Sequence, residues 1–171
     1  GYMDVIAAHQ HGLVEACAPL GTALTPEHAS LIKRYAGEAV IVFDADSAGL
    51  SAAIRGAEIL LAEGLAVRIA TVPQGKDPDE HLHEYGIESF QKCLVDAVDL
   101  VVFKMELLIK AHQAPLSARD KASVAKQVLA TISQSPDQIV KAEWARRLSQ
   151  RLDISESAVL KELGLATAAP D

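Results

Sequence analysis

A short apolar run that ends in two acids constrains this sequence more than any other feature. Residues 39–43 read Ala-Val-Ile-Val-Phe and lead directly into Asp44-Ala45-Asp46. A continuous apolar run of this length predicts a strand buried on both faces, as in a parallel sheet covered by helices. Because ligands of open α/β sheets bind at the carboxyl ends of the strands, Asp44 and Asp46 stand where a site is expected.

The spacing of Asp44 and Asp46 favours a divalent cation. Side chains two positions apart on a strand lie on the same side, about 6.6 Å apart at the backbone. Two carboxylates about 5 Å apart repel by about 3 kcal/mol at an effective dielectric constant of about 20, and a cation relieves that repulsion. Oxygen ligands favour Mg²⁺, Mn²⁺ or Ca²⁺ over zinc. The alternative is that one Asp caps the following helix and the other is solvated.

The segments around this strand predict an alternation of strands and helices, which is typical of a parallel sheet with right-handed crossovers. We expect strands over residues 14–20, 39–43 and 65–72, and helices over residues 1–10, 25–37 and 48–63. The buried face of the second helix is expected to carry Ala29, Leu31, Ile32 and Tyr35. The predicted fold class is therefore α/β, with helices flanking a parallel sheet.

A second acidic cluster, Gly75-Lys76-Asp77-Pro78-Asp79-Glu80, follows the last expected strand. Locally it has the form of a helix start, with Asp77 as N-cap, Pro78 at the first position and Glu80 as the acid of a capping box. The functional interpretation is that these acids face the same metal pocket as Asp44 and Asp46.

From about Leu100 onward the sequence predicts helices alone, so we expect one domain over residues 1–96 and a small all-helical bundle over residues 97–171. A helix over residues 100–110 is followed by one capped at Ser117, one opened by Pro136-Asp137 and one capped at Ser155. Their expected core residues are Ala125, Val128, Leu129, Ile132, Val140, Trp144, Leu148, Ile154 and Val159. The stretch 148–159 has a helix-turn-helix pattern, which we interpret as packing because its last helix carries acids.

Composition narrows the classes of function. The net charge of −7 argues against a protein that binds nucleic acid by itself, since such proteins normally have a basic face. No window approaches the roughly 20 apolar residues of a membrane span, and the first residues lack a signal-peptide pattern. Cys17 and Cys93 are expected to be reduced, packed thiols of a cytoplasmic protein. The histidine pairs 9/11 and 81/83 are spaced i, i+2, so neither predicts a zinc site.

Three blocks together resemble the Toprim core of bacterial DNA primase: residues 1–6 (Gly-Tyr-Met-Asp-Val-Ile), residues 42–49 and residues 75–80. Residues 19–25 resemble the stretch between the first two blocks, and the helical remainder resembles the bundle that closes the primase polymerase core. The order and spacing of three motifs make this resemblance more specific than Asp-x-Asp alone.

The resemblance implies metal-dependent synthesis of short RNA primers on single-stranded DNA from ribonucleoside triphosphates, in the cytoplasm. It implies Mg²⁺ or Mn²⁺ as cofactor and no zinc in this segment. Asp44 and Asp46 would be the catalytic acids and principal ligands, and Lys76 would contact a phosphate. The acids that match the family's metal ligands are Asp4, Asp44, Asp46, Asp77 and Asp79.

The sequence also departs from the family. In the family, a strand ending in a catalytic Glu precedes the first block, whereas this sequence starts at Gly1. The basic template-gripping subdomain, the zinc-binding domain and the domain that binds the replicative helicase have no counterpart here. We therefore expect a primase fragment that is inactive alone. Two alternatives remain: a haloacid-dehalogenase-type phosphatase with Asp44 as nucleophile, and a non-catalytic, metal-sensitive interaction module.

Overall fold

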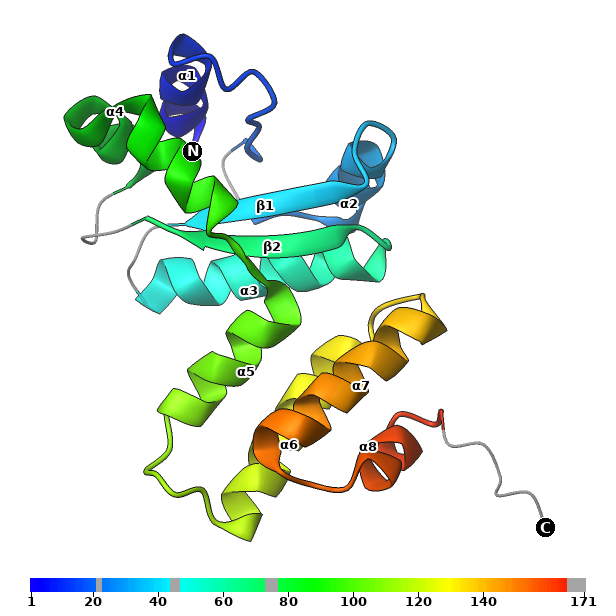
Figure 1. The fold of residues 1–171 in the computed structure, drawn as a ribbon. Coiled ribbons are helices and arrows are strands. Elements are labelled where there is room, and N and C mark those ends of the chain that lie inside the picture. Colours follow the sequence, from blue (N-terminus) through cyan, green and yellow to red (C-terminus); the bar gives the residue numbers. More distant parts are fainter. Residues whose placement is uncertain (21–22, 44–46, 73–76, 166–171) are drawn as a thin grey trace. The chain divides into compact units, whose positions relative to one another are not determined.

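The computed structural model describes residues 1–20, 23–43, 47–72 and 77–165. The chain divides into two compact units, residues 1–100 and residues 101–171. The first unit contains the sheet and all the acid motifs, and the described part of the second consists of helices joined by loops (Figure 1).

The sheet of the first unit is formed by β1 (Glu38–Phe43), β2 (Ala66–Thr71) and β3 (Val98–Asp99), in the order β1-β2-β3. β1 and β2 pair in parallel, from Glu38 opposite Ala66 to Phe43 opposite Thr71. The short β3 pairs antiparallel with β2. The predicted α/β class is confirmed, and the parallel pair brings the carboxyl ends of β1 and β2 to the same edge of the sheet.

Helices cover both faces of this sheet. In the first unit they are α1 (Tyr2–Gln10), α2 (Pro26–Lys33), α3 (Ser47–Ala62) and α4 (Pro78–Val95). Alternation along β1 separates the two sides: Ile41 faces α3 at Gly56, whereas Val42 packs with the apolar cluster of α1 and α4. Figure 1 shows α3 along one face and α4 on the other.

Residues 14–20 were predicted to form a strand, and that prediction is wrong. They form turns and irregular chain, and the side chains of Val14 and Leu20 are 67% and 85% exposed. The Ala16 carbonyl oxygen lies 2.9 Å from Nε2 of His9, so a side chain occupies an acceptor that a neighbouring strand would use. Pro19 also lacks the backbone N–H that a sheet ladder needs.

The buried face predicted for the second helix is partly wrong. α2 begins as expected, since Oγ1 of Thr25 accepts a hydrogen bond from the backbone nitrogen of His28. However, α2 ends at Lys33, and Tyr35 lies beyond it and is 84% exposed. Leu31 is exposed as well, whereas Ala29 is fully buried and Ile32 is half-buried. The short helix therefore packs through a small residue and part of one larger apolar side chain.

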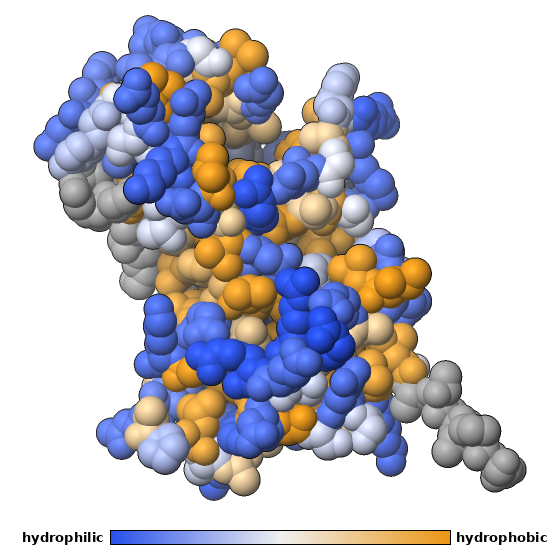
Figure 2. All heavy atoms as spheres, viewed as in Figure 1, coloured by the Kyte–Doolittle hydropathy of each residue, from blue (hydrophilic) through white to orange (hydrophobic). Residues whose placement is uncertain are grey.

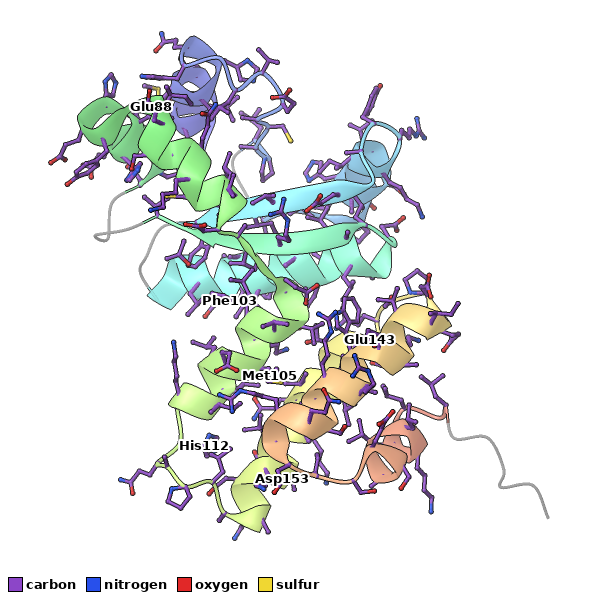
Figure 3. The ribbon with its side chains drawn as sticks, viewed as in Figure 1. Glu88, Phe103, Met105, His112, Glu143 and Asp153 are labelled. Atoms are coloured by element: carbon purple, nitrogen blue, oxygen red, sulfur yellow. The ribbon has the colours of Figure 1, made fainter. Side chains whose placement is uncertain are left out.

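The second unit contains α5 (Leu100–Lys110), which begins at the boundary, then α6 (Ala118–Ile132), α7 (Gln138–Leu152) and α8 (Glu156–Glu162). The N-caps predicted at Ser117 and Ser155 are confirmed, and Asp137 caps the helix start predicted at Pro136-Asp137. Met105 of α5 points into the core of this unit (Figure 3). The remaining buried core residues are Val101, Val124, Ala125, Val128, Leu129, Ile132, Ala145, Leu148, Leu152 and Val159.

The predicted row along α7 is partly confirmed. Leu148 is fully buried and Trp144 packs against the core, but Val140 is exposed because it lies in the first turn of α7. Ile154 and Val159 belong to the same core, as expected for a hydrophobic staple at the start of α8. In the part of the chain that is described, no helix is long and apolar enough to cross a membrane.

Candidate metal centre

The start of α4 carries two of the predicted site residues, Asp77 and Asp79. The predicted cap at Asp77 is confirmed: its Oδ1 accepts a hydrogen bond from the backbone nitrogen of Glu80 at 2.7 Å. Pro78 occupies the first turn and is buried. The positive end of the helix dipole favours the acids of this turn. The same turn is therefore both a helix cap and a cluster of acids.

Asp4 reaches this turn from the other end of the first unit's sequence. Its Oδ1 accepts a hydrogen bond from the backbone nitrogen of Asp79 at 3.3 Å. Its Oδ2 accepts one from the Gly1 nitrogen, which fixes the carboxylate on the first turn of α1. The contact holds because α1 packs on α4 through buried apolar side chains, namely Ala7, Ala8, Leu82 and Phe90. The fold thus joins two predicted site residues that lie far apart in the sequence.

Asp44, Asp46 and Lys76 lie outside the described residues. The two acids follow Phe43, the last residue of β1, and Lys76 precedes Asp77 along the chain. Among the residues that are described, no three His, Cys, Asp or Glu side chains are grouped so that they hold a metal ion. Asp4, Asp77 and Asp79 therefore do not form a complete ligand set by themselves. The carboxylate oxygens that they offer are of the kind that Mg²⁺ or Mn²⁺ prefers.

Histidines near these acids were not assigned a role from the sequence. Nε2 of His83 lies 3.6 Å from Oδ1 of Asp79, one helical turn away, and the ring of His11 meets that of His83 edge-on. The i, i+4 spacing of Asp79 and His83 was the available signal. The expectation that His81 and His83 point in different directions is confirmed, because His81 is 2% exposed and the His83 side chain is 70% exposed.

The two cysteines differ from each other. Both are free thiols, as expected, but the prediction that both are packed is wrong for Cys17, which is exposed on the irregular segment after α1. Cys93 lies on α4 and donates to the backbone oxygen of Ser89. Burial raises the pKa of the Cys93 thiol, so its protonated form is favoured.

Comparison with known proteins indicates the class of protein that this chain resembles. Residues 1–82 match the family described as Toprim-like. The chain resembles DNA primase of Clostridium acetobutylicum, with 37% identity over 93% of this chain and 26% of that protein. It resembles DNA primase of Escherichia coli K12 with 33% identity, over 95% of this chain and 28% of that protein. The chain thus spans about a quarter of the length of the curated primases that it matches.

Solved structures agree with the sequence matches. A DNA primase domain from Pseudomonas aeruginosa superposes with a TM-score of 0.84 at 30% identity, covering 96% of this chain and 52% of that one. A DnaG primase catalytic domain bound to single-stranded DNA gives a TM-score of 0.82 at 30% identity, covering 92% and 51%. The first unit therefore has the fold of the Toprim-like part of these primases. Together with the helical unit, it corresponds to a segment of the catalytic core of bacterial DNA primases, which confirms the resemblance and leaves the phosphatase alternative without support.

Proposed function

We propose that this chain supplies the metal-binding part of a primase catalytic core, which makes short RNA primers on single-stranded DNA. The observation that carries the proposal is the hydrogen bond between Asp4 and the backbone of Asp79, at the sheet edge where Asp44 follows β1. It joins two of the three motifs on which the resemblance to primases rests. The similarity to primases over nearly the whole chain supports the same activity.

In this proposal the acids contribute to metal binding in different ways. Asp44 and Asp46 are the principal metal ligands, and Asp4, Asp77 and Asp79 act directly or through water. Bound Mg²⁺ or Mn²⁺ would activate the attacking 3′-hydroxyl and stabilise the leaving pyrophosphate. Asp4 and Asp77 also accept backbone hydrogen bonds at the start of α4, so they hold the acidic turn in place. Lys76 would contact a phosphate of the incoming nucleotide.

The template and nucleotides are expected to bind through the whole protein. Residues 1–100 carry 6 Lys or Arg against 15 Asp or Glu, which gives no obvious basic track for a DNA backbone. A related catalytic domain has been solved with single-stranded DNA, which supports the template class. The replicative helicase is the expected protein partner, through a domain outside this segment, and the cytoplasm is the expected compartment.

A Mn²⁺ titration of the 171-residue chain tests the metal centre. We expect weak binding that broadens the backbone amide signals of Asp4, Asp79 and Glu80 selectively, because these lie at the proposed centre. The control signal is the amide of Ser149, in the helical unit. The double variant Asp44→Asn/Asp46→Asn should lose the selective broadening, and in a primer assay the isolated chain should make no primers.

Two outcomes would contradict the proposal. Selective broadening that persists in the double variant would remove Asp44 and Asp46 from the ligand set. No response to any divalent ion at millimolar concentration would remove the metal centre altogether. Robust primer synthesis by the isolated chain would instead show that this segment needs no further domain to grip its template.

A further inference from the structure

Helix α4 is broken in its middle, at Gly86. This glycine has φ +75° and ψ 177°, far from helical values, so α4 consists of two helical pieces, residues 78–85 and residues 87–95. The left-handed φ explains why glycine stands there. A break of this kind interrupts the i to i−4 hydrogen bonds of the backbone. The angle between the two pieces must therefore be fixed by side chains.

The two pieces of α4 are attached to different parts of the first unit. The first piece begins with the acidic turn and receives the carboxylate of Asp4. The second piece is tied to the sheet, because Arg68 of β2 donates to the Leu94 carbonyl oxygen at 3.3 Å. Arg68 also pairs with Glu38 of β1, so this attachment reaches both parallel strands. A contact between the two pieces of α4 therefore links the acidic turn to the sheet.

A partly buried side-chain hydrogen bond spans the break. Nε2 of His81, in the first piece, lies 3.0 Å from Oγ of Ser89, in the second. The His81 ring packs against the rings of Tyr85, at 5.0 Å between centroids, and of Phe90, at 6.0 Å. The His81 backbone nitrogen also donates to the Asp77 carbonyl oxygen at 3.0 Å. One residue is thus bonded to the acidic turn on one side and to the second piece on the other.

We propose that His81 and Ser89 form a clamp that sets the angle between the two pieces of α4 and thereby holds Asp77 and Asp79 against Asp4. Both are positioning residues, since neither is placed at the metal itself. The effect of the clamp on metal affinity rests on the proposed function, whereas its effect on the Asp4–Asp79 contact does not. Burying a ring nitrogen without a hydrogen bond costs free energy, and Ser89 supplies a partner for Nε2 of the buried His81 ring.

The test uses three variants of the whole 171-residue chain. His81→Leu keeps apolar volume and removes the bond, Ser89→Ala removes only the hydroxyl, and Ser89→Thr keeps a hydroxyl. We expect Mn²⁺ affinity to fall about tenfold in the first two, as is common when a side chain that orients metal ligands is removed. The double variant should lose no more than either single variant, and Ser89→Thr should restore binding.

Amide hydrogen exchange of Asp79 supplies a readout that needs no metal. Its backbone nitrogen is bonded to Asp4, so its exchange should accelerate in His81→Leu and in Ser89→Ala. The matched control is Ser149→Ala, which removes a hydroxyl of a buried serine in the helical unit and should change neither measurement.

Unchanged Asp79 exchange and unchanged Mn²⁺ affinity in Ser89→Ala would overturn the clamp. If the unaltered chain binds no Mn²⁺, the proposed function fails and the exchange measurement alone decides the clamp. If His81→Leu does not fold, Ser89→Ala carries the test, because it removes one oxygen from a half-buried position. Equal losses in Ser89→Ala and Ser89→Thr would show a packing defect and would also overturn the clamp.

Discussion

Two acids of the helical unit and Asp77 of the candidate metal centre have different partners. In the helical unit, Glu106 pairs with Arg151, and Glu143 pairs with both Arg146 and Arg147. At the candidate metal centre, Asp77 accepts a hydrogen bond from a backbone nitrogen at the start of α4. A backbone amide orients a carboxylate and leaves its charge in place, whereas an arginine neutralises it. The comparison teaches that Asp77 retains its negative charge where a cation is proposed.

Overall charge follows the same division. Residues 1–100 carry 6 basic and 15 acidic residues, and residues 101–171 carry 10 and 8. Hydrophilic residues gather over the middle of α7 (Figure 2), and Arg146 and Arg147 are exposed. The carboxylate of Glu143, labelled in Figure 3, lies within 2.8 Å of nitrogens of both arginines. The excess of acid lies in the unit that contains the proposed metal centre.

The largest expected effect separates packing from metal binding. Leu148→Ala should lower the free energy of unfolding of the helical unit by about 3 kcal/mol, because it opens a cavity at a fully buried position. Urea unfolding followed by fluorescence of Trp144, the single tryptophan, measures it. Mn²⁺ affinity should not change. The control on the same helix is Ile139→Ala, at an exposed position, with a cost below about 0.5 kcal/mol. Loss of metal binding in Leu148→Ala would show that metal binding depends on the packing of the helical unit.

A smaller effect of opposite sign is expected at the metal centre. Without metal, Asp44→Asn or Asp46→Asn should leave stability unchanged or raise it by less than about 1 kcal/mol, because one of two repelling carboxylates is neutralised. Thermal unfolding in chelator-treated buffer measures this. Asp77→Ala is the comparison, since loss of an N-cap costs about 1 kcal/mol. A fall for Asp44→Asn as large as that for Asp77→Ala would favour the capping role for Asp44.

The smallest effect concerns the charge cluster on α7. Hydrogen bonds from Arg146, and then from Arg147, lower the pKa of Glu143 from 4.5 to about 2. Because the folded-state pKa lies below the ordinary value, Glu143 adds stability above about pH 4.5, and this contribution disappears as the pH falls toward 2. Glu143→Gln should therefore lower the melting temperature slightly at pH 7 and not at pH 2. The exposed Glu162→Gln is the control. An equal difference at both pH values would show that the charge of Glu143 is not responsible.

The helix caps could be predicted from the sequence, because each cap depends on residues that are close to it along the chain. Thr25, Asp77, Ser117 and Asp137 each accept from a backbone nitrogen two or three residues on, so the sequence itself carries the cap. Burial depends on what packs against a segment, and that is why the expected strand at residues 14–20 failed. The same reason explains the missed strand β3, which is two residues long and exists through its pairing with β2.

The candidate site divides in the same way. The spacing of Asp44 and Asp46 after β1 is enough to predict a pair of metal ligands. Asp4 cannot be predicted in this way, because nothing in its own helix indicates a site. Only the resemblance to primases suggested it. Its bond to Asp79 depends on how α1 packs against α4. The clamp at His81 and Ser89 had no sequence signal either, because it depends on the break at Gly86.

The bond between Asp4 and Asp79 also has a consequence for the order of folding. It joins residues 75 positions apart, whereas the cap at Ser117 joins residues 3 positions apart. Closing a long loop costs chain entropy before any contact repays it, and contacts of long sequence separation slow folding. The helical unit can therefore gain its structure early and from local segments. The acidic turn becomes complete only when α1 docks on α4. The ability to bind a metal is therefore expected to arise late in folding.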